Sequence, residues 1–140
     1  MKQIQILLVE DDPGDVRLIQ EAFRNSQISY NLQVVSDGIE ALDLLYRKSK
    51  STSGKLPNLI LLDLNLPGKD GKQILDEIKS DKRLWHIPII VFSTSDNEDD
   101  IKASYDLHAN CYITKPEDFD KYEEAIQIIE KFWLTLAQLP

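Results

Sequence analysis

The sequence is poor in cysteine, in long apolar runs and in positive charge. Cys111 is the single cysteine among 140 residues, so the chain cannot form an internal disulfide. No apolar run approaches the roughly 18 residues that a membrane-spanning helix needs. The 16 Lys and Arg residues are outnumbered by 24 Asp and Glu, which gives a net charge of −8. That excess disfavours nucleic-acid and anionic-membrane partners. Because no signal-peptide pattern opens the chain, we expect a cytoplasmic protein.

The chain otherwise has the composition of an ordinary globular domain. Hydrophobic residues make up 42% of it and charged residues 29%. A chain of 140 residues is long enough to bury a core of its own. We therefore expect one domain over residues 1–140, without a second domain.

Apolar runs and helical patterns alternate five times along the chain, without internal repeats. Strands are expected at residues 4–9, 31–35, 59–62, 87–92 and 111–114. Helices are expected at residues 13–25, 39–48, 72–79, 98–107 and 119–136. Asp37 and Gly38 are expected to form a turn. The polar segment 49–55 is expected to be a flexible surface loop. This alternation predicts βαβ crossovers and a parallel sheet covered on both faces. The predicted fold is therefore α/β, of the flavodoxin-like (βα)5 type, with strand order 2-1-3-4-5.

The segment PNLILLDLNLPGKDG, at residues 57–71, organises the chain. Its apolar run is typical of a strand buried on both faces, and that strand ends at Asp63. Ligands of open α/β sheets bind beyond the carboxyl ends of the strands. A carboxylate there can be a nucleophile, a metal ligand or merely the N-cap of the next helix.

Other ionisable and hydroxyl residues also follow predicted strands. The set at the strand ends is Glu10, Asp11, Asp63, Ser93, Thr94 and Lys115. Like charges that converge raise one another's pKa unless a cation binds, and Mg²⁺ prefers carboxylate, water and phosphate oxygens. Together with an ammonium and hydroxyl donors, such a site suits a phosphoryl group held on Asp63.

Each of these residues also has a purely structural interpretation. Lys115 can be an ion-pair partner that only neutralises the acidic cluster, and Ser93 and Thr94 can cap a turn. The joint placement of these residues at four strand ends favours the functional interpretation.

The segments ILLVEDDP, LILLDLNLPGKDG, PIIVFSTS and CYITKP resemble the receiver domain of two-component response regulators, in order and at the spacing of that family. The resemblance extends from Ile4 to about Leu136. It implies Mg²⁺-dependent transfer of a phosphoryl group from a sensor histidine kinase to Asp63. In that family the metal is held by residues matching Asp11, Asp63 and the backbone carbonyl of Asn65. The resemblance also implies that Glu10 holds the metal through a water.

The resemblance also implies a switch. Lys115 matches the lysine that contacts the phosphoryl group, Ser93 the switch hydroxyl and Tyr112 the switch aromatic, and Thr94 adds a further hydroxyl at the catalytic centre. The switch would change the surface formed by helix 4, strand 5 and helix 5. A receiver of this kind catalyses its own phosphorylation and dephosphorylation and is a signalling protein rather than a metabolic enzyme.

Three features depart from the common family pattern. Glu10 stands where many members have Asp, Glu117 stands where an aromatic is frequent, and the segment 49–55 is longer than usual. The long loop and the ending FWLTLAQLP are similar to the single-domain regulators that are paired with cyanobacterial phytochromes. A phytochrome is therefore the kinase partner that the resemblance implies.

The expected helix 119–136 carries two apolar stripes. Phe119, Tyr122, Ile126, Ile129, Trp133 and Leu136 form a normal core-facing stripe. Ile128, Phe132 and Leu139 form a second set on another side. A helix on a sheet buries one stripe, so the second predicts a homodimer, unless the chain end folds back and covers Phe132.

Three competing functions can be compared with the sequence. An aspartyl-nucleophile phosphatase of the haloacid-dehalogenase type needs an acid where this chain has Asn65. A flavin-binding module of the same fold needs a phosphate-binding loop after the first strand, where this chain is acidic from Glu10 to Asp12. A receiver-like module that only binds partners stays open, although the complete acidic set and Lys115 argue against it.

Overall fold

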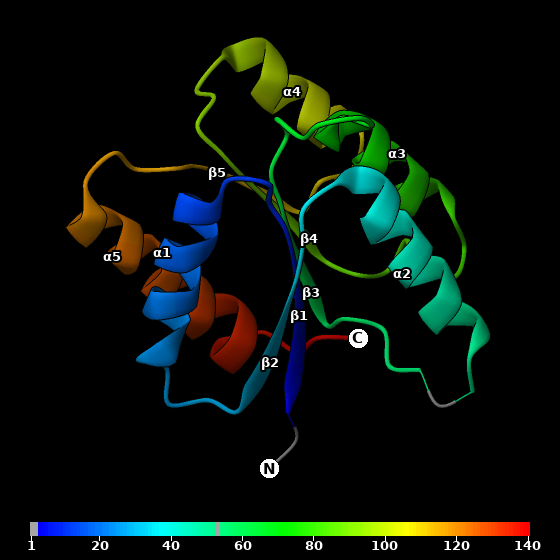
Figure 1. Cartoon of the computed structure of the whole chain (residues 1–140), viewed down its shortest axis with the longest axis horizontal. Coiled ribbons are helices and arrows are strands. Elements are labelled where there is room, and N and C mark those ends of the chain that lie inside the picture. The colour runs from blue at the N-terminus through cyan, green and yellow to red at the C-terminus, as the bar shows by residue number, and fades with distance from the viewer. Residues whose placement is uncertain (1–2, 53) are drawn as a thin grey trace.

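Five parallel strands form the sheet, and helices cover both of its faces (Figure 1). The computed structural model describes residues 3–52 and 54–140. The strands are β1 (Ile4–Val9), β2 (Tyr30–Val35), β3 (Leu59–Leu62), β4 (Ile89–Ser93) and β5 (Cys111–Thr114). Their order is β2-β1-β3-β4-β5 and every neighbouring pair is parallel. The predicted flavodoxin-like α/β fold and its strand order are confirmed.

Five α-helices connect and follow the strands. They are α1 (Pro13–Arg24), α2 (Gly38–Lys50), α3 (Gly71–Ser80), α4 (Glu98–Asp106) and α5 (Phe119–Ile129). An Asp or Asn side chain accepts a backbone N–H at the start of each one, which satisfies donors that the first helical turn leaves free. None of the described helices is long and apolar enough to cross a membrane.

Two boundaries around α2 differ from the sequence prediction. We expected Asp37 and Gly38 to form a turn, but Asp37 is the N-cap of α2 and Gly38 its first residue. The helix then continues to Lys50, so the segment 49–55 begins as helix rather than as loop. Ser53 of that segment lies outside the described residues.

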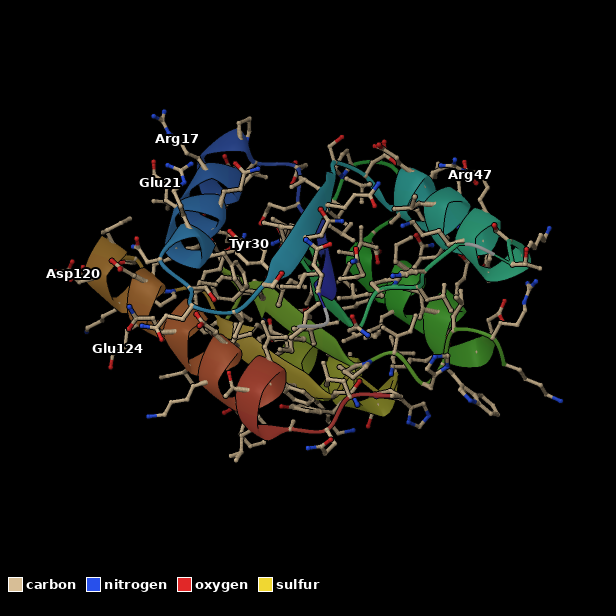
Figure 2. All side chains as sticks on the ribbon, turned by 90° about the horizontal axis from the view of Figure 1, so that it is seen from below. Arg17, Glu21, Tyr30, Arg47, Asp120 and Glu124 are labelled. Atoms are coloured by element: carbon tan, nitrogen blue, oxygen red, sulfur yellow. The ribbon has the colours of Figure 1, made fainter. Side chains whose placement is uncertain are left out.

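Alternating side chains of the central strands supply two separate cores. On one face Leu7, Ile60 and Val91 pack with residues of α2 and α3. On the other face Ile6, Leu8, Leu61 and Phe92 pack with residues of α1 and α5. Figure 2 shows this division from another side, with the labelled surface residues of α1 and α5 on one flank and Arg47 of α2 on the other. Burial on both faces explains why β3 is apolar throughout.

The last helix does not stay α-helical to residue 136 as predicted. It is an α-helix to Ile129 and continues as a π-helix, η1 (Glu130–Leu136). Hydrogen bonds over five residues, such as the one from the Ala137 N–H to the Phe132 carbonyl at 2.8 Å, put more residues into each turn. The buried face therefore moves: Leu134 is buried, whereas Leu136 is 71% exposed.

The second apolar stripe of this region is divided by the chain end. Leu139 folds back and packs against the core between the sheet, α1 and α5. Ile128 stays 58% exposed and Phe132 49% exposed. The fold-back that we considered as an alternative to a dimer therefore occurs, but it leaves half of Phe132 uncovered.

The change of helix type predicts that substitutions of Leu134 and Leu136 have different effects on stability. Leu134→Ala should lower the free energy of unfolding by about 2–4 kcal/mol, because it opens a cavity in the core. Leu136→Ala should change that of the monomer by less than about 0.5 kcal/mol, because its side chain there is mostly in solvent. Urea unfolding followed by circular dichroism measures both. A larger loss for Leu136→Ala would mean that the helix stays α-helical to its end.

Candidate functional site

The pairing of β1 with β3 brings three carboxylates together at one edge of the sheet. Val9 is the register partner of Leu62, so the residues that follow them, Glu10 and Asp63, are neighbours. The Asp63 N–H donates to the Val9 carbonyl at 3.0 Å. One carboxylate oxygen from each of Glu10, Asp11 and Asp63 lies within 4.8 Å of the others. Glu10 and Asp63 are buried and Asp11 is exposed, so the cluster is open to solvent on the Asp11 side.

The loop after β3 holds Asp63 in place without using it as a helix cap. Asp70 caps α3, in a reciprocal arrangement with Gln73. A Cβ on Gly71 would lie 2.4 Å from the Asp63 carbonyl oxygen, so only glycine allows the chain to return this close to β3. The Asn65 N–H donates to Asp63 Oδ1 at 3.2 Å. The capping interpretation of Asp63 is therefore wrong, and its second carboxylate oxygen faces the other charged groups.

Lys115 enters the cluster from the end of β5. Its N–H donates to the Ser93 carbonyl at 2.7 Å, which continues the β4–β5 ladder by one bond. Its ammonium is buried and donates to Glu10, to Asp15 Oδ2 at 3.0 Å and to Asp63 Oδ2 at 3.4 Å. The structure thus brings Lys115 together with the carboxylates that follow β1 and β3.

Burial and the neighbouring charges shift the pKa values of Glu10 and Lys115. Burial raises the pKa of Glu10 to about 7, with a further rise from the Asp63 charge, although the Lys115 hydrogen bond opposes it. For Lys115, burial lowers the pKa, but the carboxylates of Glu10, Asp63 and Asp15 outweigh it and raise the pKa to about 12. The ammonium is therefore charged at neutral pH, and Glu10 titrates near neutrality.

Ser93 and Thr94, the two hydroxyl residues predicted for the site, differ in burial. Ser93 is the last residue of β4 and is fully buried, and its Oγ accepts the Ser95 N–H at 3.3 Å. Thr94 is exposed. The Tyr112 hydroxyl donates to the Ser95 carbonyl at 2.8 Å. Tyr112 and Ser93 are thus both connected to Ser95, at the start of the segment that leads into α4.

Asp15 belongs to the site and the sequence analysis did not assign it there. It is the third residue of α1, and the ammonium of Lys115 bonds one of its oxygens. The other oxygen accepts the Tyr122 hydroxyl of α5 at 3.5 Å. An acid in a first helical turn is common because it interacts favourably with the helix dipole, so Asp15 did not stand out in the sequence. Its position could have predicted the role, because a helix that starts directly after β1 has its first turn near the carboxyl ends of the strands.

The donor set of this site fits a hard divalent cation. Carboxylate oxygens from three residues converge, and one carboxylate lies toward solvent, where waters could complete the coordination. Asp11 and Asp63 could bind such an ion directly, and Glu10 could reach it as well. An ion there would also relieve the repulsion among carboxylates that are close together.

Comparison with known proteins relates nearly all of the chain to one family. The family model described as response regulator receiver domain matches residues 6–127. Response regulator Rcp1 of Synechocystis sp. is 47% identical over 135 residues, which are 96% of this chain and 92% of that protein.

Solved structures agree with this assignment. The phosphorylated cyanobacterial phytochrome response regulator RcpA superposes with a TM-score of 0.93 and 50% identity, over 99% of each chain. The Mn²⁺-bound form of response regulator Rcp1 superposes with a TM-score of 0.91 and 47% identity, over 98% of this chain and 99% of that one. The predicted similarity to regulators of cyanobacterial phytochromes is confirmed.

The raised pKa of Glu10 predicts how stability depends on pH when no divalent cation is bound. A group with a raised pKa binds its proton more tightly in the folded state. The resulting stability is present below pH 4.5, the ordinary value, and is lost as the pH rises through about 7. The loss should be on the order of 3 kcal/mol between the two limits. Urea unfolding in chelator from pH 5 to pH 8 should show this decline in wild type and a flatter profile in Glu10→Gln. Parallel profiles would contradict the assignment.

Proposed function

This chain belongs to the response regulator receiver domain family, and we propose that it accepts a phosphoryl group from the phosphohistidine of a sensor histidine kinase onto Asp63. The observation that carries the proposal is the environment of this carboxylate. It is 7% exposed, it lies within 4.8 Å of two other acids, and a buried ammonium lies 3.4 Å from it. A carboxylate that is partly neutralised in this way is suited to bond an anionic phosphoryl group.

The proposed transfer is a single displacement at phosphorus. An Asp63 carboxylate oxygen forms the new O–P bond while the P–N bond to the kinase histidine breaks, and the histidine nitrogen keeps the electron pair. Asp11, Asp63 and the Asn65 backbone carbonyl would hold Mg²⁺, and Glu10 would reach it through a water. The bound ion would supply positive charge that neutralises the phosphoryl oxygens. The Lys115 ammonium and the hydroxyls of Ser93 and Thr94 contact the same oxygens. Water later attacks the phosphorus, which releases inorganic phosphate and restores the carboxylate.

The relatives support this chemistry and suggest the partner. RcpA has been solved in a phosphorylated form and Rcp1 with Mn²⁺ bound. RcpA is a phytochrome response regulator, and we propose a phytochrome-type histidine kinase as the phosphodonor of this chain. Such a pair acts in the cytoplasm, and the net charge of −8 makes nucleic acid an unfavourable partner.

Phosphorylation should require both Asp63 and a divalent cation. Incubation with acetyl phosphate and Mg²⁺ should add the mass of one phosphoryl group to the intact protein, and a chelator should prevent it. Asp63→Asn should add none, because an amide oxygen is a poor nucleophile. Asp70→Asn is the matched control, since it makes the same change in the same loop and Asn also caps helices. Asp11→Asn should take the phosphoryl group only at higher Mg²⁺ concentration.

Two outcomes of this experiment would contradict the proposed function. If Asp63→Asn gains phosphate at the wild-type rate, Asp63 is not the acceptor. If wild type gains none, the chain is a binding module without phosphoryl chemistry. A phosphatase would release phosphate with rapid turnover, which the amide of Asn65 in place of an acid disfavours.

We also propose that phosphorylation changes the surface formed by α4, β5 and α5. The phosphoryl group draws the Ser93 hydroxyl toward Asp63, and Tyr112 then turns inward. Tyr112 packs partly buried against the core, and its hydroxyl donates to the Ser95 carbonyl at 2.8 Å, so a turn of its ring would act on the segment that leads into α4. A phosphoryl group shifts this equilibrium only through contacts that are better in one state, and the Ser93 hydroxyl supplies that contact.

The C-terminal helical region is the proposed homodimer contact. Ile128, Phe132 and Leu136 are 58%, 49% and 71% exposed, and they lie within one short stretch of α5 and η1. Clustered exposed apolar side chains often mark an interface. A two-fold arrangement would pack this stretch of each subunit on that of the other.

Phe132→Glu should therefore give a folded monomer that still accepts a phosphoryl group on Asp63. Sedimentation velocity at tens of micromolar measures the oligomeric state, with and without acetyl phosphate. Ile39→Glu is the matched control, because Ile39 is 56% exposed on α2 and the same change there should leave the dimer intact. A wild-type monomer under both conditions would rule the dimer out.

A further variant in the same series tests the switch. Ser93→Ala should take the phosphoryl group but show no difference in self-association between its two forms. If wild type changes its self-association on phosphorylation and Ser93→Ala changes equally, Ser93 does not couple the two events.

A further inference from the structure

We propose, on the basis of the phosphoryl transfer proposed above, that Asp15 is a positioning residue that holds the Lys115 ammonium beside the phosphoryl group on Asp63. An ammonium has three protons, and Lys115 directs them at Glu10, Asp15 and Asp63. Of these three carboxylates, only Asp15 lies outside the cluster that can bind a divalent cation.

Cation binding makes this difference important. If Asp63 held a cation and Glu10 reached that cation through a water, its positive charge would weaken the attraction of both carboxylates for the Lys115 ammonium. Asp15 reaches the ammonium from α1, and its Oδ2 lies 3.0 Å from the Lys115 Nζ. Because Asp15 lies outside the cation-binding cluster, its attraction for the ammonium would persist. It therefore remains as the partner that keeps the ammonium in place while a phosphoryl group arrives.

Asp15 has a second partner, Tyr122, which does not take part in the chemistry. The Tyr122 hydroxyl lies 3.5 Å from its second oxygen. Tyr122 is 3% exposed, and its ring packs edge-on against Phe92 at 5.2 Å between centroids. Burial and the neighbouring acids raise the pKa of Tyr122, so its hydroxyl keeps its proton and can donate it. Asp15 is thus fixed between a buried tyrosine and a buried lysine.

Asp15 has a second effect that must be separated from positioning. Its negative charge repels an incoming phosphodonor, and this repulsion does not depend on Lys115. Positioning acts only through the ammonium. A double-mutant cycle with Lys115 therefore distinguishes the two, because the repulsion is equal in both backgrounds and cancels.

The rate of phosphorylation by acetyl phosphate at saturating Mg²⁺ should be measured for wild type, Asp15→Asn, Lys115→Ala and the double variant. Asp15→Asn should slow wild type roughly three- to tenfold and should not slow Lys115→Ala. Glu21→Gln is the matched control: Figure 2 shows Glu21 on the outer side of the same helix, and its loss should leave the rate unchanged. Equal effects of Asp15→Asn on the rates of wild type and of Lys115→Ala would overturn the positioning role.

A readout without turnover tests the same contact. The ¹⁵N-bound protons of the Lys115 ammonium should exchange with water faster in Asp15→Asn than in wild type, in the metal-free protein and with Mg²⁺. Tyr122→Phe keeps the ring packing and removes only the hydroxyl, so it should shift exchange in the same direction by less. Unchanged exchange in Asp15→Asn would overturn the proposal. Failure of the proposed function looks different, since wild type itself would then take up no phosphoryl group.

Discussion

The parallel pairing of β1 with β3 is the constraint on which the site depends. It places Glu10 next to Asp63 and continues past the strands as a bond between the Asp63 N–H and the Val9 carbonyl. Carboxylates this close and this buried repel one another, and the fold offsets the repulsion with the buried ammonium of Lys115. Because that ammonium follows β5, on the far side of β4, the strand order is itself a requirement of the charge balance.

The same ammonium connects the chemistry to the rest of the molecule. Lys115 contacts residues that follow β1 and β3 and one that belongs to α1, and its backbone bonds Ser93 of β4. A change of charge at Asp63 therefore changes the electrostatic environment of an ammonium that contacts several elements. Ser93 and Tyr112 both contact Ser95, which leads into α4, so the proposed signal has a short physical route from the sheet edge to the surface.

Local patterns predicted most of the fold and most of the site. Strands that are apolar throughout, such as β3, and the regular alternation with helices were enough to predict the parallel sheet, and the choice of a flavodoxin-like fold supplied its strand order. The site followed because the carboxyl ends of parallel strands meet at one edge. The predictions that failed concern phase and capping. Asp37 and Gly38 begin a helix instead of a turn, and η1 turns Leu134 rather than Leu136 toward the core. A π-helix has no sequence signature comparable to the helical period.

The sequence by itself determined which chemical groups are present and which predicted strand each one follows, because the hydrophobic period of each element is a local property. Only the tertiary structure decided which of those groups touch. Asp15 and Tyr122 bond each other although they are far apart in the chain, and the contact arises from the packing of α1 on α5. Likewise, the half-exposed state of Phe132 depends on where the chain end packs. Contacts of this kind depend on the relative positions of whole elements, which residue spacing along one element does not contain.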